Sequence, residues 1–280
     1  MQIRSAGAKS ILTRTSGFIA EAGFTHSLTP ARNCTFGCTY CYVPTMGIYG
    51  GLKPEDWRRW GQFTTYKSNA AELLRRELRP SQSIYCSPLV DPYQPAEASV
   101  EMMPRILDAL MEAPPRVFTI QTRGPLILRD IERLRALSLR TTLRVSFSLT
   151  TNREDIRRLY EPYCAKFEER LEVVRGLRDA GIETYATLAP LLPCDPEVLA
   201  EAAIEATRRD LIGDPLHIRA TKRHGATTRE AAFRIGAAHG HDDYLNASKQ
   251  RRVVEQIDAF ARRAGFIFTI GPRGFARLAL

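Results

Sequence analysis

Apolar and polar positions along the chain follow two periods. Short runs rich in β-branched residues predict strands, and runs with apolar residues three and four apart predict helices. Strands are expected at residues 25–28, 83–86, 117–121, 142–149, 183–189 and 215–220. Helices are expected at residues 69–78, 100–111, 128–137, 162–180, 196–208 and 248–264.

Each expected strand is followed by a helix, which favours parallel pairing with right-handed crossovers. Gly181 is suited to end one helix, and Asp195-Pro196 is suited to begin the next. The fold class expected is therefore α/β, a partial (β/α)6 TIM-type barrel with parallel strands. Residues 1–280 are expected to form one barrel domain, with a cysteine-rich loop at 33–42.

Composition fits such a domain, because 44% of the 280 residues are hydrophobic and 25% are charged. No apolar run approaches the roughly 20 residues of a membrane helix, and no secretory leader is evident. We expect a cytoplasmic protein without a membrane partner. The net charge is +9, and residues 217–280 hold twelve Lys and Arg against five Asp and Glu. This basic C-terminal part is either a nucleic-acid surface or a solvated helix face.

Three of the six cysteines crowd into eight residues, in the pattern Cys34-x3-Cys38-x2-Cys41. Thiolates suit iron–sulfur clusters and zinc. This spacing lets one loop wrap three corners of a 4Fe–4S cubane, and Gly37 permits the turn. The fourth iron then lacks a protein ligand and can chelate the amino and carboxylate groups of a methionine-type cofactor.

Two other readings of the cysteines are open. A structural zinc knuckle would need a fourth ligand, and His26 is the nearby candidate. An electron-transfer ferredoxin would ordinarily have four cysteines around its cluster, and the remaining three here are scattered. A non-catalytic iron–sulfur or zinc module is thus the alternative of another class.

The cysteine pattern, with Tyr40 in the aromatic place before Cys41, resembles the signature of the radical S-adenosylmethionine (SAM) superfamily. The resemblance implies a 4Fe–4S cluster on Cys34, Cys38 and Cys41, bound SAM and a 5′-deoxyadenosyl radical that removes a substrate hydrogen. It also implies an external electron donor such as flavodoxin or ferredoxin.

A narrower resemblance covers residues 25–190, which are similar to the spore photoproduct lyase-like, or DNA repair photolyase-like, branch. The resemblance depends on four short sequence motifs: Asp91-Pro92-Tyr93-Gln94-Pro95-Ala96-Glu97, Thr122-Arg123, Ser146-Phe147-Ser148 and Ala189-Pro190.

Barrel enzymes place their chemistry at the carboxyl ends of strands, and several of these ends are polar here. Arg123 is a candidate partner for the SAM carboxylate, since a guanidinium is a two-pronged donor. Ser146 and Ser148 point the same way by strand period and are candidates for the ribose. Ser87, which closes the second strand, and Tyr40, beside Cys41, are the other candidates for cofactor binding. The basic run 219–223 follows the sixth strand.

Cys86 resembles by position the hydrogen-atom donor of spore photoproduct lyase, and is the candidate catalytic residue. A weak S–H bond suits the quenching of a carbon radical, whereas an inert buried cysteine is the plain alternative. Cys194 is a rival donor, and Cys164 is expected to be structural. Residues 44–66, with Trp57 and Trp60, are either an active-site cover or a packed insertion.

The sequence leaves two radical functions open. One is SAM-dependent radical chemistry on a nucleobase or nucleic acid, including lyase-like repair. The other is radical modification of a peptide or a small metabolite, because fold does not fix function.

Overall fold

The computed structural model describes residues 1–45, 59–217 and 228–280. Its main element is an eight-stranded sheet in which every neighbouring pair is parallel except the pair of β2 and β3 at one edge. In spatial order the strands are β11 (Phe268–Ile270), β10 (Leu211–Pro215), β9 (Thr184–Leu191), β8 (Thr142–Ser148), β7 (Val117–Thr122), β6 (Ser83–Cys86), β3 (His26–Leu28) and β2 (Leu12–Arg14).

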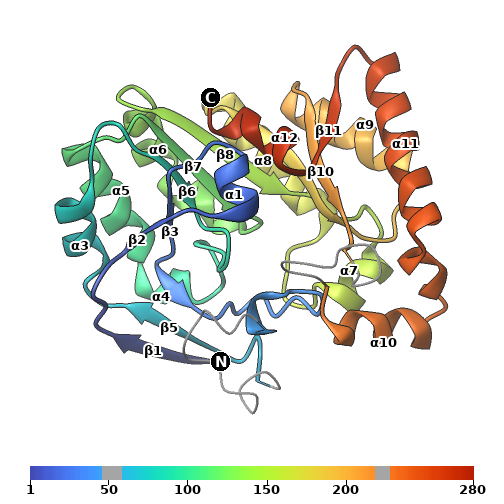
Figure 1. Cartoon of the computed structure of the whole chain (residues 1–280), viewed down its shortest axis with the longest axis horizontal. Helices are drawn as coiled ribbons and strands as arrows, with labels where there is room; N and C mark the ends of the chain where they lie inside the picture. The colour runs from blue at the N-terminus through green and yellow to red at the C-terminus, as the bar shows by residue number, and fades with distance from the viewer. Residues whose placement is uncertain (46–58, 218–227) are drawn as a thin grey trace.

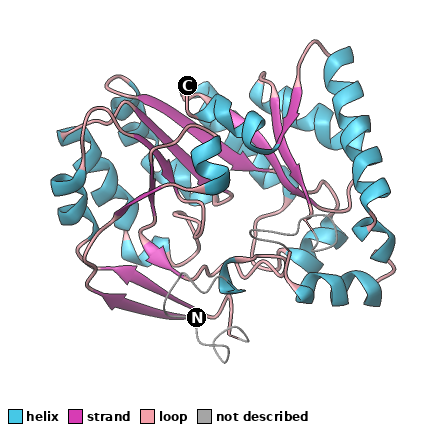
Figure 2. Ribbon diagram, viewed as in Figure 1, coloured by secondary structure: helices cyan, strands magenta, loops and turns pink. Residues whose placement is uncertain are grey.

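Helices connect the parallel strands and cover the outside of the sheet (Figures 1 and 2). They are α3 (Ala70–Glu77), α4 (Glu97–Val100), α5 (Met102–Glu112), η3 (Pro125–Asp130), α6 (Ile131–Ser138), α7 (Glu154–Tyr160), α8 (Phe167–Asp179), α9 (Pro196–Thr207), α10 (Glu230–Ala238), η4 (Asp242–Leu245) and α11 (Ala247–Arg263). Their apolar faces bury side chains such as Ile106, Leu134 and Val174 completely.

A second, three-stranded sheet lies beside the first. Its order is β1 (Gln2–Ala6), β5 (Phe63–Lys67) and β4 (Ala31–Arg32). The cysteine loop, residues 33–42, follows β4 directly, and the short helix η1 (Val43–Thr45) follows the loop. The small sheet therefore holds the strand from which the cysteine loop departs.

Alternate residues of the main sheet face away from the outer helices into the interior of the partial barrel. At its amino-terminal end this interior is filled by α1 (Gly17–Glu21), α12 (Gly271–Phe275) and η5 (Ala276–Leu278), which lie across the strands in Figure 1. Tyr185 and Ile212 pack there with Phe275. Thr119 Oγ1 also donates to the carbonyl of Leu278 at 2.7 Å. These elements occupy the amino-terminal end of the interior. The polar carboxyl ends of the strands lie at the opposite end of the partial barrel.

The expected parallel α/β arrangement is confirmed, and so are both helix boundaries that the sequence indicated. Gly181 has φ +78° after α8, and Asp195 is the N-cap of α9 with proline in its first turn. Strands β2 and β11 extend the sheet beyond the six expected strands.

Two expected elements were misplaced. The sixth strand is β10, at Leu211–Pro215 rather than 215–220, because the buried pair Leu211 and Ile212 enters the sheet and Pro215 can only end the pairing. Residues 218–220 lie outside the described residues. The helix expected at 162–180 begins at Phe167, and residues 162–166 form a loop that contacts the cysteine loop. Throughout the described ranges, no helix is long and apolar enough to cross a membrane.

Candidate active site

The cysteine loop consists of tight turns. The Gly37 amide donates to the carbonyl of Cys34 at 3.3 Å, and the Cys41 amide donates to that of Cys38 at 3.2 Å. Gly37 has φ +62°, and a Cβ added there would lie 3.2 Å from Gly61 Cα. Glycine at this position therefore serves both the turn and the close approach of the chain. Cys34 and Cys38 are buried, and Cys41 is half-buried.

The three thiols have different proton affinities. Burial raises the pKa of Cys34, and it raises the pKa of Cys41 to about 12. A hydrogen bond with Cys164 lowers the pKa of Cys38, and the Arg123 charge contributes in the same direction against burial. Thiols bind metals as thiolates, so metal binding here is coupled to proton release.

The donors fit an iron–sulfur cluster, since one continuous loop supplies three thiols, the ligand type that such clusters take. Within residues 1–45, 59–217 and 228–280, no three His, Cys, Asp or Glu side chains converge as a single metal ion would require. A tetrahedral zinc ion needs four ligands, whereas the cysteine loop supplies three thiols. His26, the zinc candidate, lies on β3 and contacts Thr25.

A segment far along the chain braces the cysteine loop. In this bracing segment, residues 160–170, the carbonyl of Tyr160 accepts from the Thr39 amide at 2.9 Å. Cys164 Sγ lies 4.0 Å from Cys38 Sγ. The Tyr163 ring lies against Gly37. The loop is therefore held across a sequence separation of more than 120 residues.

Glu161 is the centre of a buried ionic network in this segment. Its carboxylate, with no exposed area, accepts from Tyr40 Oη at 2.6 Å and from Thr150 Oγ1 at 2.8 Å, and it pairs with Arg123 and Arg170. Burial opposes its ionisation, but the charges of Arg170 and Arg123 outweigh burial and lower the pKa of Glu161 to about 2. The network therefore contains an ionised carboxylate.

Two predicted cofactor residues, Tyr40 and Arg123, belong to this network. The Arg123 side chain is 15% exposed, and its Nη1 lies 3.6 Å from Cys38 Sγ. The structure thus places Arg123 beside Cys38, with its charge engaged by Glu161. Its pairing with the SAM carboxylate stays a prediction.

A second segment, residues 91–97, also supports the cysteine loop. Gln94 Oε1 accepts from the Thr35 amide at 2.8 Å and from Thr35 Oγ1 at 3.1 Å. Asp91 accepts from Thr122 Oγ1 at 2.6 Å and from the Arg123 amide at 2.8 Å. Burial raises the pKa of Asp91, although these hydrogen bonds oppose the shift. Residues 91–97 therefore connect the end of β7 with the cysteine loop.

Replacing Gln94 by leucine should loosen the cysteine loop. The Thr35 amide and hydroxyl would lose their buried acceptor, at a cost of about 1–3 kcal/mol, and the reconstituted protein should lose iron to a chelator faster. Urea unfolding and the rate of iron release measure the two effects.

Gln82→Leu is the matched control, because the Gln82 side chain is also buried and hydrogen-bonds backbone groups of Arg79 and Glu77, away from the cysteines. It should cost similar stability without faster iron loss. Equal iron release from both variants would contradict the role of Gln94.

The barrel interior carries a polar ladder toward the carboxyl ends of the strands. Gln121 Oε1 accepts from Tyr85 Oη and from Ser146 Oγ, each at 2.6 Å, and Gln121 Nε2 donates to Ser148 Oγ at 2.8 Å. Ser146 Oγ also contacts Thr187 Oγ1 at 2.5 Å. Ser146 and Ser148 therefore point the same way, as strand period predicted, and they share Gln121. Binding of ribose by these serines stays a prediction.

Cys86 is not part of the polar ladder around Gln121. It alternates with Tyr85 along β6, is fully buried, and belongs with Ile84 to the hydrophobic core that includes the outer helices. Burial raises its pKa, as do the charges of Asp91 and Glu97. The adjacent Ser87 donates to Thr29 Oγ1 at 3.2 Å.

The other candidate hydrogen donor, Cys194, is half-buried, and its Sγ lies 4.0 Å from Tyr244 Oη. Hydrogen donation by either cysteine stays a prediction.

Sequence reasoning missed three residues that contact the site, namely Gln121, Glu161 and Arg170, which no local motif marks. It named Cys164 but expected that residue to be structural. Of the predicted features, Trp57 and the basic run 219–223 lie outside the described residues. Trp60 is described and is buried in the core around the cysteine loop.

This chain is similar to other proteins of known sequence and to some of known structure. Curated relatives include an uncharacterised protein of Mycobacterium tuberculosis, 29% identical over 62% of this chain and 52% of its own length. Another uncharacterised protein, from Methanocaldococcus jannaschii, is 25% identical over 57% of this chain and 58% of its own length. The chain therefore matches between half and three fifths of each relative.

Solved structures of spore photoproduct lyase share the fold. One variant of that enzyme has a TM-score of 0.61 and 14% identity, over 96% of this chain and 81% of the enzyme. Another variant, with bound AdoMet and dinucleoside spore photoproduct, has a TM-score of 0.58 and 13% identity over the same shares. A sequence profile of the radical SAM superfamily matches residues 28–202, well over half of the chain. Its proteins use a 4Fe–4S cluster and SAM, and this chain belongs to the radical SAM superfamily.

Proposed function

We propose that this protein is an enzyme that reductively cleaves SAM at a 4Fe–4S cluster held by Cys34, Cys38 and Cys41. The resulting 5′-deoxyadenosyl radical would abstract hydrogen from a nucleobase or nucleic acid. The observation that carries the proposal is the braced cysteine loop, which presents three thiols beside the polar ends of parallel strands. An external one-electron donor, of the flavodoxin or ferredoxin kind, completes the proposal.

When bound, the cluster would supply one electron to the sulfonium of SAM and so release methionine and the radical. The residues of this chain prepare that step. Arg123, fixed by Glu161, keeps a positive charge beside Cys38. The Ser146, Gln121 and Ser148 ladder offers hydrogen-bonding groups for a nucleoside in the barrel interior. Helices α1 and α12, which fill the amino-terminal end of the barrel interior, exclude solvent from that end.

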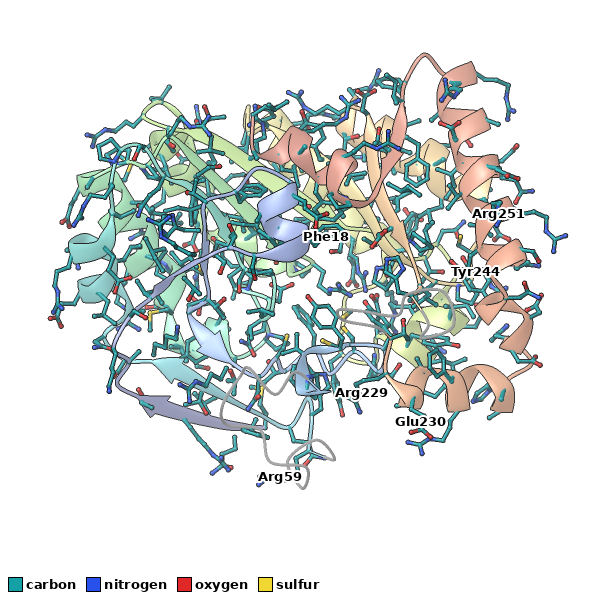
Figure 3. All side chains as sticks on the ribbon, viewed as in Figure 1. Phe18, Arg59, Arg229, Glu230, Tyr244 and Arg251 are labelled. Atoms are coloured by element: carbon teal, nitrogen blue, oxygen red, sulfur yellow. The ribbon has the colours of Figure 1, made fainter. Side chains whose placement is uncertain are left out.

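Two observations support a nucleic acid as the substrate. Spore photoproduct lyase, whose fold this chain shares, has been solved with AdoMet and a dinucleoside photoproduct. The chain also carries an exposed basic helix, α11, from which Arg251 projects outward (Figure 3). Cationic side chains that neutralise phosphates give sequence-independent affinity.

The reaction is tested by anaerobic reconstitution with iron and sulfide, followed by dithionite and SAM. Methionine and 5′-deoxyadenosine should form in equal amounts. Deuterium transfer from a labelled oligonucleotide into 5′-deoxyadenosine would identify the substrate. An intact cluster that yields no 5′-deoxyadenosine would contradict the proposed enzyme, and label transfer only from a peptide or metabolite would contradict the nucleic-acid substrate.

The nucleic-acid proposal makes a separate prediction for α11. In the described part of the chain Arg251 and Arg252 have no ion pair, whereas Arg262 pairs with Asp258 and Arg263 with Glu197. Arg251→Ala/Arg252→Ala should weaken oligonucleotide binding. It should also make the slope of the logarithm of the binding constant against the logarithm of salt concentration shallower, by up to about two, because each lost phosphate contact changes that slope by about one.

Arg262→Ala/Arg263→Ala is the matched control, since it removes the same formal charge from side chains that are already paired. Binding titrations at several salt concentrations measure both variants. Equal losses of binding affinity in the two variants would indicate that net charge attracts the polyanion, and that Arg251 and Arg252 have no special part in binding it.

A further inference from the structure

The described cysteines include one close pair. Cys164 Sγ lies 4.0 Å from Cys38 Sγ, and both side chains are buried. Neither Cys34 nor Cys41 has such a contact with another thiol in the ranges that the structure describes, and Cys194 contacts a tyrosine instead. One corner of the cysteine loop therefore has two sulfurs, although the family signature requires only one.

The second sulfur is held in place by its backbone. The Cys164 amide donates to the carbonyl of Glu161 at 3.0 Å, and the Cys164 carbonyl accepts from Arg157 Nη1 at 2.8 Å. Arg170 Nε donates to the next carbonyl, that of Ala165, at 2.9 Å. Cys164 therefore stays beside Cys38 as a consequence of how the bracing segment is built.

Charged side chains surround this pair. The guanidinium groups of Arg123 and Arg170 contribute two positive charges, and the Glu161 carboxylate contributes one negative charge. The two sulfurs therefore lie beside a buried network that carries a net positive charge.

We propose that Cys164 is a reserve ligand for the iron that Cys38 binds. With a metal–thiolate bond of about 2.3 Å, two sulfurs that reach one iron can lie up to about 4.6 Å apart, and the observed 4.0 Å is within that reach. In the exchange, the Cys164 thiol gives up its proton as its bond to iron forms. The bond from iron to Cys38 breaks, and Cys38 takes up a proton, so no oxidation state changes.

This inference rests on the proposed function only insofar as the cysteine loop holds a cluster. It is tested with Cys38→Ser and Cys38→Ser/Cys164→Ser, which keep side-chain volume, after anaerobic reconstitution. The controls are Cys34→Ser and Cys34→Ser/Cys164→Ser. Iron and acid-labile sulfide per chain, the cluster's charge-transfer absorption and retention against a chelator are measured, with circular dichroism as the check of folding.

The Cys38→Ser protein should keep its cluster at least roughly tenfold more firmly than the double variant, while both Cys34 variants should lose it. Equal loss from folded Cys38→Ser and Cys34→Ser, with a loaded wild type, would overturn the reserve ligand. So would equal retention in Cys38→Ser and its double variant. A wild type that takes up no cluster would instead contradict the proposed function.

A second measurement needs no change at Cys38. In the otherwise unchanged protein, Cys164→Ser should lose iron to the chelator faster, because a corner that opens can no longer be recaptured by the neighbouring thiol. If Cys38→Ser does not fold, this comparison decides, and an unchanged rate of iron loss would overturn the proposal.

Discussion

A Cys41→Ala protein is expected to fold, to bind no stable iron–sulfur cluster and to form no 5′-deoxyadenosine. Cys41 is a single ligand in the proposed site, with no second thiol beside it in the described structure. Loss of groups that only orient ligands commonly costs 10–100-fold in metal affinity, so loss of a ligand should cost more than roughly 100-fold. Iron and sulfide analysis, with quantification of 5′-deoxyadenosine, measures the effect.

Cys194→Ala is the control, since Cys194 is a cysteine of the same chain that lies by Tyr244. It should keep the cluster and SAM cleavage, whatever its effect on the final product. A Cys41→Ala protein that retains a full cluster would show that the loop does not hold the cofactor as proposed.

Replacing Glu161 by glutamine is expected to be the most destabilising conservative change in the site. The substitution keeps the shape but leaves Arg123 and Arg170 without their shared counter-charge, where the Arg170 side chain is only 2% exposed. Removal of one partner from a buried ion pair typically costs about 3–5 kcal/mol. The free energy of unfolding, obtained from denaturant titration of the protein without cofactor, measures it.

Glu205→Gln provides the comparison, because Glu205 pairs with Arg175 at the surface, with side chains 48% and 36% exposed. Such exposed pairs contribute about 0–1 kcal/mol. If the two glutamine variants were equally stable, the Glu161 network would have no more structural weight than a surface pair.

The central fold was predictable because its signals are local. Residues 83–86 were expected as a strand and are β6, since a short buried run between polar boundaries has few alternatives. The sixth strand was misplaced because its apolar part is only Leu211 and Ile212, directly after a helix. The antiparallel β2 is short and mostly exposed, which gives a weak signal.

The same distinction applies to the site. The three cysteines share one loop, and their spacing alone indicated a cluster. Glu161 and Cys164 reach that loop from more than 120 positions away in the chain, and no motif surrounds them. Cys164 was expected to be structural, and its position beside Cys38 had no signal in the sequence. Only tertiary packing brings these groups together.

The bracing segment also limits how this cysteine loop could be transplanted. The loop does not carry its own scaffold, because its backbone, Tyr40 and Cys38 all depend on residues 160–170. A chimaera that grafts residues 33–42 alone into another barrel would leave the loop without these supports. The transferable unit is a set of distant segments, which includes residues 91–97 as well as the bracing segment, and engineered exchanges between relatives should move them together.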